Sequence, residues 1–333
     1  MKNIIKYIFL IPVFFSCNKL IFNDDLETQS KHENFNYLWN QANEKYAYFE
    51  VKNIDWDSIK TVYEPQVNEE MSDDAFFTLM GNMLSELKDD HTNLVSDFNV
   101  SRFGVKYDAQ DNFDWRLIED NYLPRNYYTS GSFKHAFIDN GNIGYIRFAE
   151  FTGKVTHDNM NFMLDRYKNT KGLIIDLREN GGGVINDAFT ILSHFVDKET
   201  LLFYSRAKAG PGHDEFTEIE PTRVSPSGTY YGKKVMVLVD RGTFSAGSFT
   251  SLATKAIPNM ILMGDTTGGG LGLPNGGQLP NGWTYRFSIS QTLNLQKSPE
   301  FEQGVPVEIP VNMNWDNKNT DEIIERAILE INK

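Results

Sequence analysis

The sequence predicts an α/β protein in the broad α+β sense, with an N-terminal helical subdomain and a larger domain built on a mixed, largely parallel sheet flanked by helices. Two patterns lead to this fold class. Apolar residues in the first part recur at spacings of three and four, as on one face of a helix. In the second part, short apolar strands alternate with helical stretches, which indicates crossover connections around parallel strands.

The first residues predict export. Lys2 and Lys6 flank the start of an apolar run that is shorter than the roughly 20 residues needed to span a bilayer, so it is typical of a secretory signal. The only cysteine, Cys17, follows this run directly. The arrangement resembles the lipobox of bacterial lipoproteins. That resemblance implies a signal peptide over residues 1–16, a lipidated Cys17 and a polar tether over 17–32; an ordinary signal peptide with an incidental cysteine is the alternative.

Residues 33–95 are predicted to form the helical domain. Ser72 is a suitable N-cap for one of its helices, because a serine side chain can accept a backbone N–H of the first turn. Two sets of apolar residues carry the helical spacing: Phe35, Leu38, Trp39, Ala42, Tyr46 and Phe49, then Phe76, Met80, Met83, Leu84 and Leu87. Residues 96–141 form a connecting region that we leave as irregular.

The second domain is predicted over residues 142–333. Its expected strands are 144–148, 172–177, 235–239 and 260–263, and its expected helices are 155–168, 184–196, 245–256 and a last one after Thr320. Between 264 and 282 the chain contains eight glycines, which suit either a mobile loop beside a substrate groove or a set of tight turns.

Composition excludes several function classes. The chain of 333 residues has 32 Lys plus Arg against 45 Asp plus Glu, a formal net charge of −13, and no basic run. Nucleic-acid binders show a basic footprint, so we expect no nucleic-acid partner. A hydrophobic content of 40% is enough for a packed core and excludes disorder over most of the chain. A single cysteine excludes an intramolecular disulfide and a cysteine-based zinc site.

Two glycine-rich turns follow buried strands and are the places where chemistry is expected. The first, 176–183, has three glycines before a helix, where exposed N–H groups suit an anion or an oxyanion. It lacks the lysine of a phosphate loop. The second, 240–248, holds Ser245 in a G-x-x-S-x-G pattern. That pattern is one residue longer than the nucleophile elbow, so it does not favour an α/β-hydrolase.

These turns together resemble the S41 peptidases, the C-terminal processing and tricorn-like serine peptidases. The matching motifs are D-x-R-x-N-G-G-G at 176–183, a T-A-S-A-like turn at 243–246, the segment 263–268, which is similar to G-x-x-T-x-G, an altered G-V-x-P-D at 304–308, and the tricorn-like D-x-H-T at 89–92. The resemblance implies a peptidase domain of the ClpP/crotonase type over 142–333. It also implies no PDZ domain, because 96–141 is too short to hold one.

The resemblance further implies that Ser245 is the nucleophile, although a serine before a helix can also be a simple N-cap. Processing-type members place a lysine base 25 positions later, but Gly270 stands there. Tricorn-like members use a histidine, and His91 occupies the matching place. An imidazole with an ordinary pKa of about 6.5 is a suitable general base.

For the acid that orients His91 the resemblance implies a late glutamate, and we favour Glu302, with Glu308 and Asp90 as alternatives. The oxyanion hole would consist of backbone N–H groups of Gly181 or Gly182 together with Ala246. Asp176 and Arg178 are expected to shape their turn rather than to react. No metal or organic cofactor is needed for such chemistry.

The sequence therefore predicts an exported serine-type peptidase, anchored by a lipid at the outer membrane or periplasmic face of a bacterial envelope. It would act on exported or unfolded polypeptides as an endopeptidase or a tail-specific enzyme. Two rivals remain: a catalytically silent S41-fold protein that binds peptides or small hydrophobic ligands, and a lipoprotein that binds glycans or nutrients. The sequence does not determine the oligomeric state.

Overall fold

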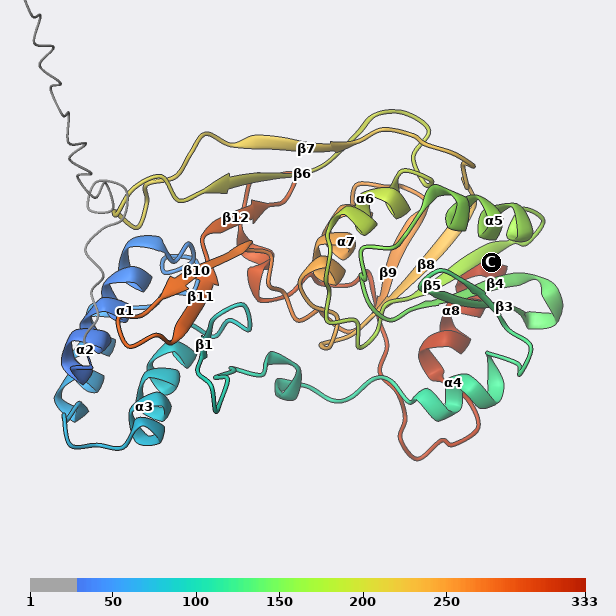
Figure 1. Ribbon diagram of the computed structural model, residues 1–333. Coiled ribbons are helices and arrows are strands. Elements are labelled where there is room, and N and C mark those ends of the chain that lie inside the picture. Colours follow the sequence, from blue (N-terminus) through green and yellow to red (C-terminus); the bar gives the residue numbers. More distant parts are fainter. Residues whose placement is uncertain (1–28) are drawn as a thin grey trace, which may run out of the picture.

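The computed structural model describes residues 29–333. The predicted signal peptide, the lipidation site Cys17 and all but the end of the predicted tether lie outside the described residues. The described chain forms two units joined by long strands and loops, with the helical unit at one end and the large sheet at the other (Figure 1). Within this part of the chain, none of the helices combines the length and the apolar character needed to cross a membrane.

The N-terminal unit contains the expected helices. Ser72 caps α3 as predicted, since its hydroxyl accepts the backbone N–H of Ala75 at 3.2 Å. The apolar faces of the helices pack into one cluster with aromatic residues of a β-hairpin from the far end of the sequence. The helices of this unit are α1 (Lys31–Lys45), α2 (Trp56–Tyr63) and α3 (Asp73–Ser85).

A small antiparallel sheet completes this unit. Its strand order is β1-β11-β10, so a strand just after His91 pairs with a hairpin that comes almost 200 positions later. Figure 1 shows the orange hairpin lying against the blue helices. The helical domain predicted over 33–95 is therefore completed by C-terminal strands. These strands are β1 (Asn93–Val95), β10 (Pro274–Gln278) and β11 (Thr284–Ser288).

The main sheet has seven strands in the order β13-β9-β8-β5-β4-β3-β2. Pairing is parallel from β4 to β13 and antiparallel between β2, β3 and β4, so the predicted mixed, largely parallel sheet is confirmed. The strands are β2 (Tyr128–Ser130), β3 (Phe133–Ile138), β4 (Ile143–Phe148), β5 (Gly172–Asp176), β8 (Lys234–Val239), β9 (Met260–Gly264) and β13 (Ile309–Pro310).

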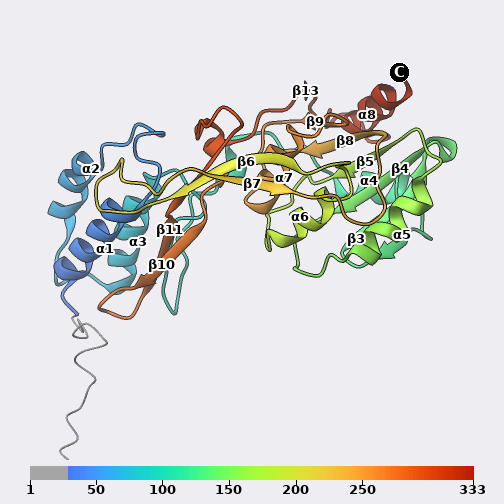
Figure 2. The ribbon, with the colours of Figure 1, turned by 90° about the horizontal axis from the view of Figure 1, so that it is seen from above.

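Helices cover both faces of this sheet. On β8, Val235 and Val237 face one apolar cluster, and Met236 and Leu238 face another, because successive strand residues point to opposite faces. The first cluster is covered by α5 (His157–Tyr167), α6 (Asn186–Leu192) and α7 (Ala246–Thr254), and the second by α4 (Trp115–Asn121) and α8 (Glu322–Asn332) (Figure 2).

One expectation needs correction. The sheet begins at Tyr128, inside the region left as irregular, because β2, β3 and α4 all lie within 96–141. The strand β3 escaped prediction because it buries a histidine. His135 is fully buried, and its two ring nitrogens lie 2.9 Å from Ser130 Oγ and 2.7 Å from Tyr167 Oη. A polar residue with both nitrogens satisfied interrupts the apolar alternation that marks a strand.

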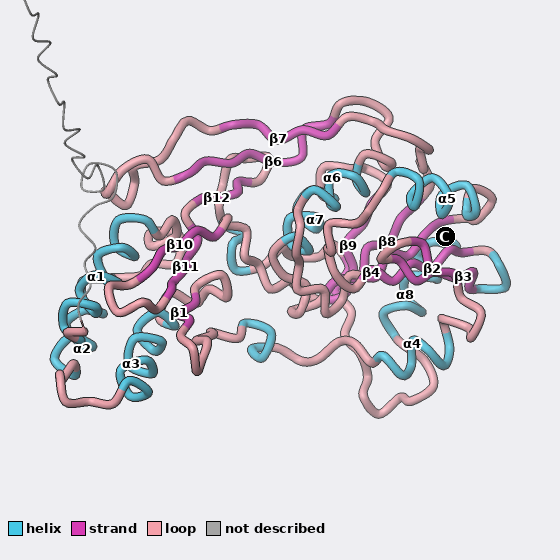
Figure 3. The backbone as a smooth tube through the Cα atoms, viewed as in Figure 1, coloured by secondary structure: helices cyan, strands magenta, loops and turns pink. Residues whose placement is uncertain are grey.

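A further three-stranded sheet bridges the two units, with the order β12-β6-β7. A long loop from β1 to α4 also connects them, as the tube in Figure 3 shows. This loop lies in the region 96–141 that was predicted to connect the two domains, whereas the bridging sheet lies outside the sequence predictions. The bridging strands are β6 (Thr200–Ala207), β7 (Glu220–Val224) and β12 (Ser290–Leu293), and short 3₁₀ turns are η2 (Glu64–Gln66), η3 (Val105–Asp108), η4 (Asp139–Gly141) and η5 (Glu300–Gln303).

Candidate active site

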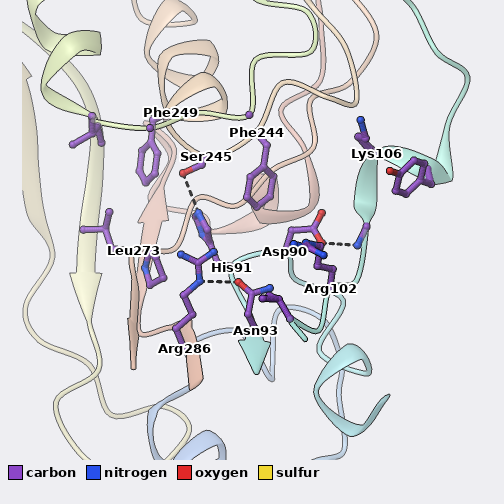
Figure 4. Close-up of a pocket in the computed structure, with 18 residues that line it drawn as sticks. Asp90, His91, Asn93, Arg102, Lys106, Phe244, Ser245, Phe249, Leu273 and Arg286 are labelled. Atoms are coloured by element: carbon purple, nitrogen blue, oxygen red, sulfur yellow. Dashed lines mark hydrogen bonds between the residues drawn. The ribbon is translucent and has the colours of Figure 1, made fainter. Parts of the chain in front are cut away.

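Ser245 stands at the sharp turn between β8 and α7, in a conformation that is rare for any residue other than glycine. Its φ is 53° and its ψ is −120°. It occupies the N-cap position of α7, yet its side chain makes no capping hydrogen bond. The hydroxyl instead lies 2.9 Å from His91 Nε2 (Figure 4). A strained backbone that aims a hydroxyl at an imidazole is typical of a functional site rather than of a helix cap.

The two predicted glycine turns interlock beneath this serine. The backbone N–H of Phe244 donates to Asn180 O at 2.9 Å, and that of Ser245 donates to Gly269 O at 3.0 Å. Gly182, at φ 95°, packs so closely that a Cβ there would lie 2.7 Å from Ser245 Cβ. Only glycine fits both the positive φ and this approach. The eight-glycine segment thus forms tight turns under Ser245 before it enters β10.

Arg178 and Asp176 have the structural role that was expected of them. Both are fully buried, and two guanidinium nitrogens bond the carboxylate at 3.0 and 2.7 Å. A third nitrogen donates to Asp321, the N-cap of α8, at 2.8 Å. The pair therefore ties the end of β5 to the C-terminal helix, and neither side chain lines the cleft at Ser245.

Two residues near Ser245 keep unused backbone donors. Gly181 and Ala246 line the cleft, and neither of their N–H groups donates to another described residue. The N–H of Gly182 is already used, since it donates to Asn180 Oδ1 at 2.9 Å. Of the two alternatives in the first turn, Gly181 is therefore the one that keeps a donor available for an oxyanion.

His91 lies in the loop between α3 and β1, and its imidazole is buried with only 5% of the residue exposed. Burial lowers its pKa, and the positive charges of Arg286 and Lys52 act in the same direction, whereas the Asp89 carboxylate and the Gly272 backbone oppose them. A lowered pKa keeps the imidazole neutral at pH 7 and able to accept a proton from Ser245.

None of the three predicted acids hydrogen-bonds the imidazole. Glu302 is 2% exposed, and its Oε2 accepts the N–H of Leu271 at 2.7 Å; burial raises its pKa to about 8. Glu308 pairs with Lys255 beside β9, and Asp90 accepts two backbone N–H groups of η3 and its N-cap. The expected direct contact between Glu302 and His91 is absent. His91 Nδ1 is buried without a well-formed hydrogen bond to any described residue.

Asp89 and Lys52 are the charged residues behind His91 that the sequence analysis did not single out. Asp89 is 4% exposed; its Oδ1 accepts the backbone N–H of His91, and its Oδ2 accepts the hydroxyl of Ser288, both at 2.8 Å. Lys52 Nζ lies 3.9 Å from Asp89 and 3.8 Å from Glu302. Asp89 could have been found as the first residue of D-x-H-T, but no local pattern marks Lys52.

Lys52 is the centre of a buried polar network. Its side chain is 2% exposed, and its ammonium donates to Tyr46 Oη at 2.9 Å and to the carbonyls of Leu87 and Lys88 at 3.2 and 3.0 Å. These carbonyls belong to the segment that leads directly to Asp89 and His91. We name this group, formed by Lys52, Asp89, Glu302 and Tyr46, the Lys52 network.

The Ser245–His91 pair opens into a cleft of about 660 Å³. Figure 4 shows that its two sides differ in chemistry. Phe249 and Leu273 lie on one side of the pair and Arg102 and Lys106 on the other, with Arg286 close to His91. A neutral imidazole, an adjacent hydroxyl and free backbone N–H groups in one cleft suit acyl transfer.

Comparison with known proteins shows the family of the chain. Residues 142–311 match peptidase family S41, and residues 28–85 match the tricorn protease C1 domain. The chain belongs to peptidase family S41. Its fold is also found in a solved structure of a candidate peptidase from Parabacteroides merdae ATCC 43184, with 36% identity and a TM-score of 0.87 over 91% of this chain and 97% of the other.

Two curated relatives come from Bacillus subtilis (strain 168). The carboxy-terminal processing protease CtpB is 24% identical over 196 residues, which is 54% of this chain and 39% of CtpB. The carboxy-terminal processing protease CtpA is 27% identical over 175 residues, which is 52% of this chain and 35% of CtpA. The chain thus matches less than half the length of either relative.

Proposed function

We propose that this protein is a serine peptidase that uses Ser245 as nucleophile and His91 as general base. The observation that carries the proposal is the 2.9 Å contact between Ser245 Oγ and His91 Nε2, made by a serine in a strained turn. The S41 membership and the names of the relatives support proteolysis as the reaction.

In the proposed reaction, Ser245 Oγ attacks a peptide carbonyl and its proton passes to His91 Nε2. The backbone N–H groups of Gly181 and Ala246 stabilise the oxyanion of the tetrahedral intermediate. His91 then gives its proton to the leaving amine, and a water molecule, deprotonated by the same imidazole, hydrolyses the acyl-enzyme.

The orienting role expected of Glu302 would be indirect. Asp89 holds the backbone of His91, and Lys52 lies between Asp89 and Glu302. We propose that Asp89 supplies the negative charge that favours the imidazolium during the reaction, and that Glu302 helps to fix Lys52. This arrangement replaces a direct carboxylate–imidazole hydrogen bond.

The proposed setting is the bacterial cell envelope, with a lipid on Cys17 and exported or unfolded polypeptides as substrates. The lipid anchor is tested separately from the chemistry. Metabolic labelling with a fatty-acid analogue should mark the parent but not Cys17→Ala. Labelling of both proteins, or of neither, would contradict lipidation at this cysteine.

A fluorophosphonate probe tests the chemistry. The purified parent should be labelled and should cleave casein or an unfolded peptide, whereas Ser245→Ala and His91→Ala should lose both activities. Labelling that survives Ser245→Ala would place the nucleophile elsewhere. Circular dichroism of each variant shows whether a loss reflects chemistry or unfolding.

A catalytically silent binding protein is the second candidate. The observation that favours it is the lack of a direct acid partner on His91 Nδ1 among the described residues. It predicts a folded parent that binds peptides, is not labelled and cleaves nothing.

A further inference from the structure

Arg286 is held in place at the edge of the catalytic pair. It projects from β11 opposite Asn93 of β1, and its Nε donates to Asn93 Oδ1 at 2.7 Å. Asn93 is itself buried and anchored, since its amide donates to Ser101 O at 2.9 Å. The other two guanidinium nitrogens of Arg286 have no partner among residues 29–333. The side chain is therefore oriented but not neutralised.

Arg102 adds a second unpaired charge to the same cleft. It makes no hydrogen bond or ion pair with any residue that the structure describes. Lys106, the third cation of the cleft, pairs with Glu179 at 3.4 Å. Asp90 also lines the cleft, but its carboxylate oxygens accept the N–H groups at the start of η3. Two guanidinium groups thus remain without an anion.

The cleft thus carries unneutralised positive charge in a chain whose net charge is −13. An acidic protein has many carboxylates that could neutralise a surface arginine, yet neither of these two is paired with one. A guanidinium with free N–H groups in a fork matches a carboxylate, which it can bind through two parallel hydrogen bonds. Phe249 and Leu273, on the side of the catalytic pair away from Arg102, offer apolar contacts.

We propose that Arg286, assisted by Arg102, forms a subsite for a substrate carboxylate next to the bond that Ser245 attacks. The inference rests on the proposed peptidase function and specifies its substrate class. The substrate is a peptide with an apolar side chain at Phe249 and Leu273 and a carboxylate at Arg286, beside His91. That carboxylate comes either from an Asp or Glu side chain or from the free C-terminus of the peptide.

Three peptides with one shared apolar core separate these sources. The first is amidated and carries Asn near the cleavage site, the second is amidated with Asp in its place, and the third has Asn and a free C-terminus. For the parent we expect kcat/KM to favour one carboxylate peptide over the neutral one by about tenfold or more, as for a hydrogen bond to a charged group. Preference for the second peptide identifies a side chain, and preference for the third a terminus.

Variants then assign the preference to the arginines. Arg286→Gln should abolish most of it, Arg286→Lys should retain a part, and Arg102→Gln should reduce it less. Arg125→Gln, at an exposed position that does not line the cleft, should leave the preference unchanged. The ratio between two peptides is measured because Arg286 also lowers the pKa of His91, an effect that acts on all substrates and cancels in the ratio.

Binding to Ser245→Ala, followed by fluorescence polarisation of labelled peptides, tests the subsite without catalysis. Tighter binding of a carboxylate peptide that is lost in Ser245→Ala/Arg286→Gln supports the subsite even if the parent proves inactive. Equal binding of all three peptides, or a preference that survives removal of both arginines, overturns it. A parent that cleaves all three peptides equally well would keep the peptidase function and refute the subsite.

Discussion

Ser245 and His91 reach the same cleft from two regions that are built differently. Ser245 belongs to the large sheet, where a buried strand, a tight turn and a helix follow one another within a few residues. His91 belongs to the N-terminal unit. Its loop is held by Ser288 of β11 and by Lys52, which in turn contacts Tyr46 at the end of α1 and Glu302 of η5. The serine is positioned by local backbone geometry, and the histidine by long-range polar contacts.

This difference indicates which substitutions far from the catalytic pair should impair the site. A turn between a central parallel strand and its helix is rigid, because the sheet and two apolar clusters surround it. The His91 loop depends on a few buried charges that stabilise it only as a complete set. Changes to the Lys52 network should therefore misplace His91 while Ser245 keeps its conformation.

The largest effect is expected from Lys52→Met. Removing the ammonium leaves the buried Asp89 carboxylate without its cation and the Lys88 carbonyl without a donor, which should cost about 3–5 kcal/mol of unfolding free energy. Urea unfolding measures this loss, with the exposed Lys198→Met as control. In the fraction of variant protein that remains folded, the fold-decrease in kcat should exceed the fold-change in KM. A Lys52→Met protein as stable and active as the control would contradict the role of the network.

The second prediction concerns pH. Because burial lowers the pKa of His91, kcat/KM should already have reached its plateau at neutral pH and should decline only in acid. Since Arg286 and Lys52 both lower this pKa, Arg286→Gln and folded Lys52→Met should shift the acid limb to higher pH. Profiles that superimpose on that of the parent would show that these charges do not act on the general base.

His91 should also affect stability in acid. Its unfolded pKa is about 6.5 and its folded pKa is lower, so the unfolded state binds more protons as the pH falls below 6.5. The contribution of His91 to stability is thus lost on acidification. His91→Gln should therefore weaken the acid dependence of Tm relative to the parent, and an unchanged dependence would contradict a lowered pKa of His91.

Glu302→Gln should have a smaller effect on stability than His91→Gln. The contribution of Glu302 to stability should also depend on pH in the opposite direction to that of His91. The folded pKa of Glu302 is about 8, above the ordinary value of 4.5, so the folded state binds more protons between these values. Its contribution is present in acid and is lost as the pH rises to 8. Glu302→Gln should therefore make Tm decline less between pH 5 and 8. An unchanged slope would show that Glu302 is ionised in the folded protein at neutral pH.

The smallest effect on stability is expected from a substitution of Ser245. Replacing Ser245 by glycine removes the strain of φ 53°, ψ −120° and should stabilise the protein by about 1 kcal/mol, while hydrolysis is lost. Ser245→Ala keeps the strained Cβ and is the matched control, inactive but not stabilised. Equal Tm values for the two variants would show that the turn is not strained.

Much of the fold was predictable because it rests on local patterns. The buried strands β5, β8 and β9 are continuous apolar runs, and the turn sequences after β5 and β8 mark Ser245 and Gly181. The strand β3 was missed because its buried His135 is satisfied by partners that a sequence does not reveal. The hairpin β10–β11 was missed as part of the N-terminal unit because its pairing with β1 joins residues almost 200 positions apart.

For the candidate site, the sequence by itself determined the residues that must stand at tight turns, since glycine and an exposed serine are required by local backbone geometry. It also indicated His91 through a short motif. Only the tertiary structure decided which acid lies behind the imidazole, that Glu302 stands apart from it, and that Lys52 and Arg286 belong to the site. Electrostatic interactions act through space, so the charges that tune a residue need not be near it in the chain.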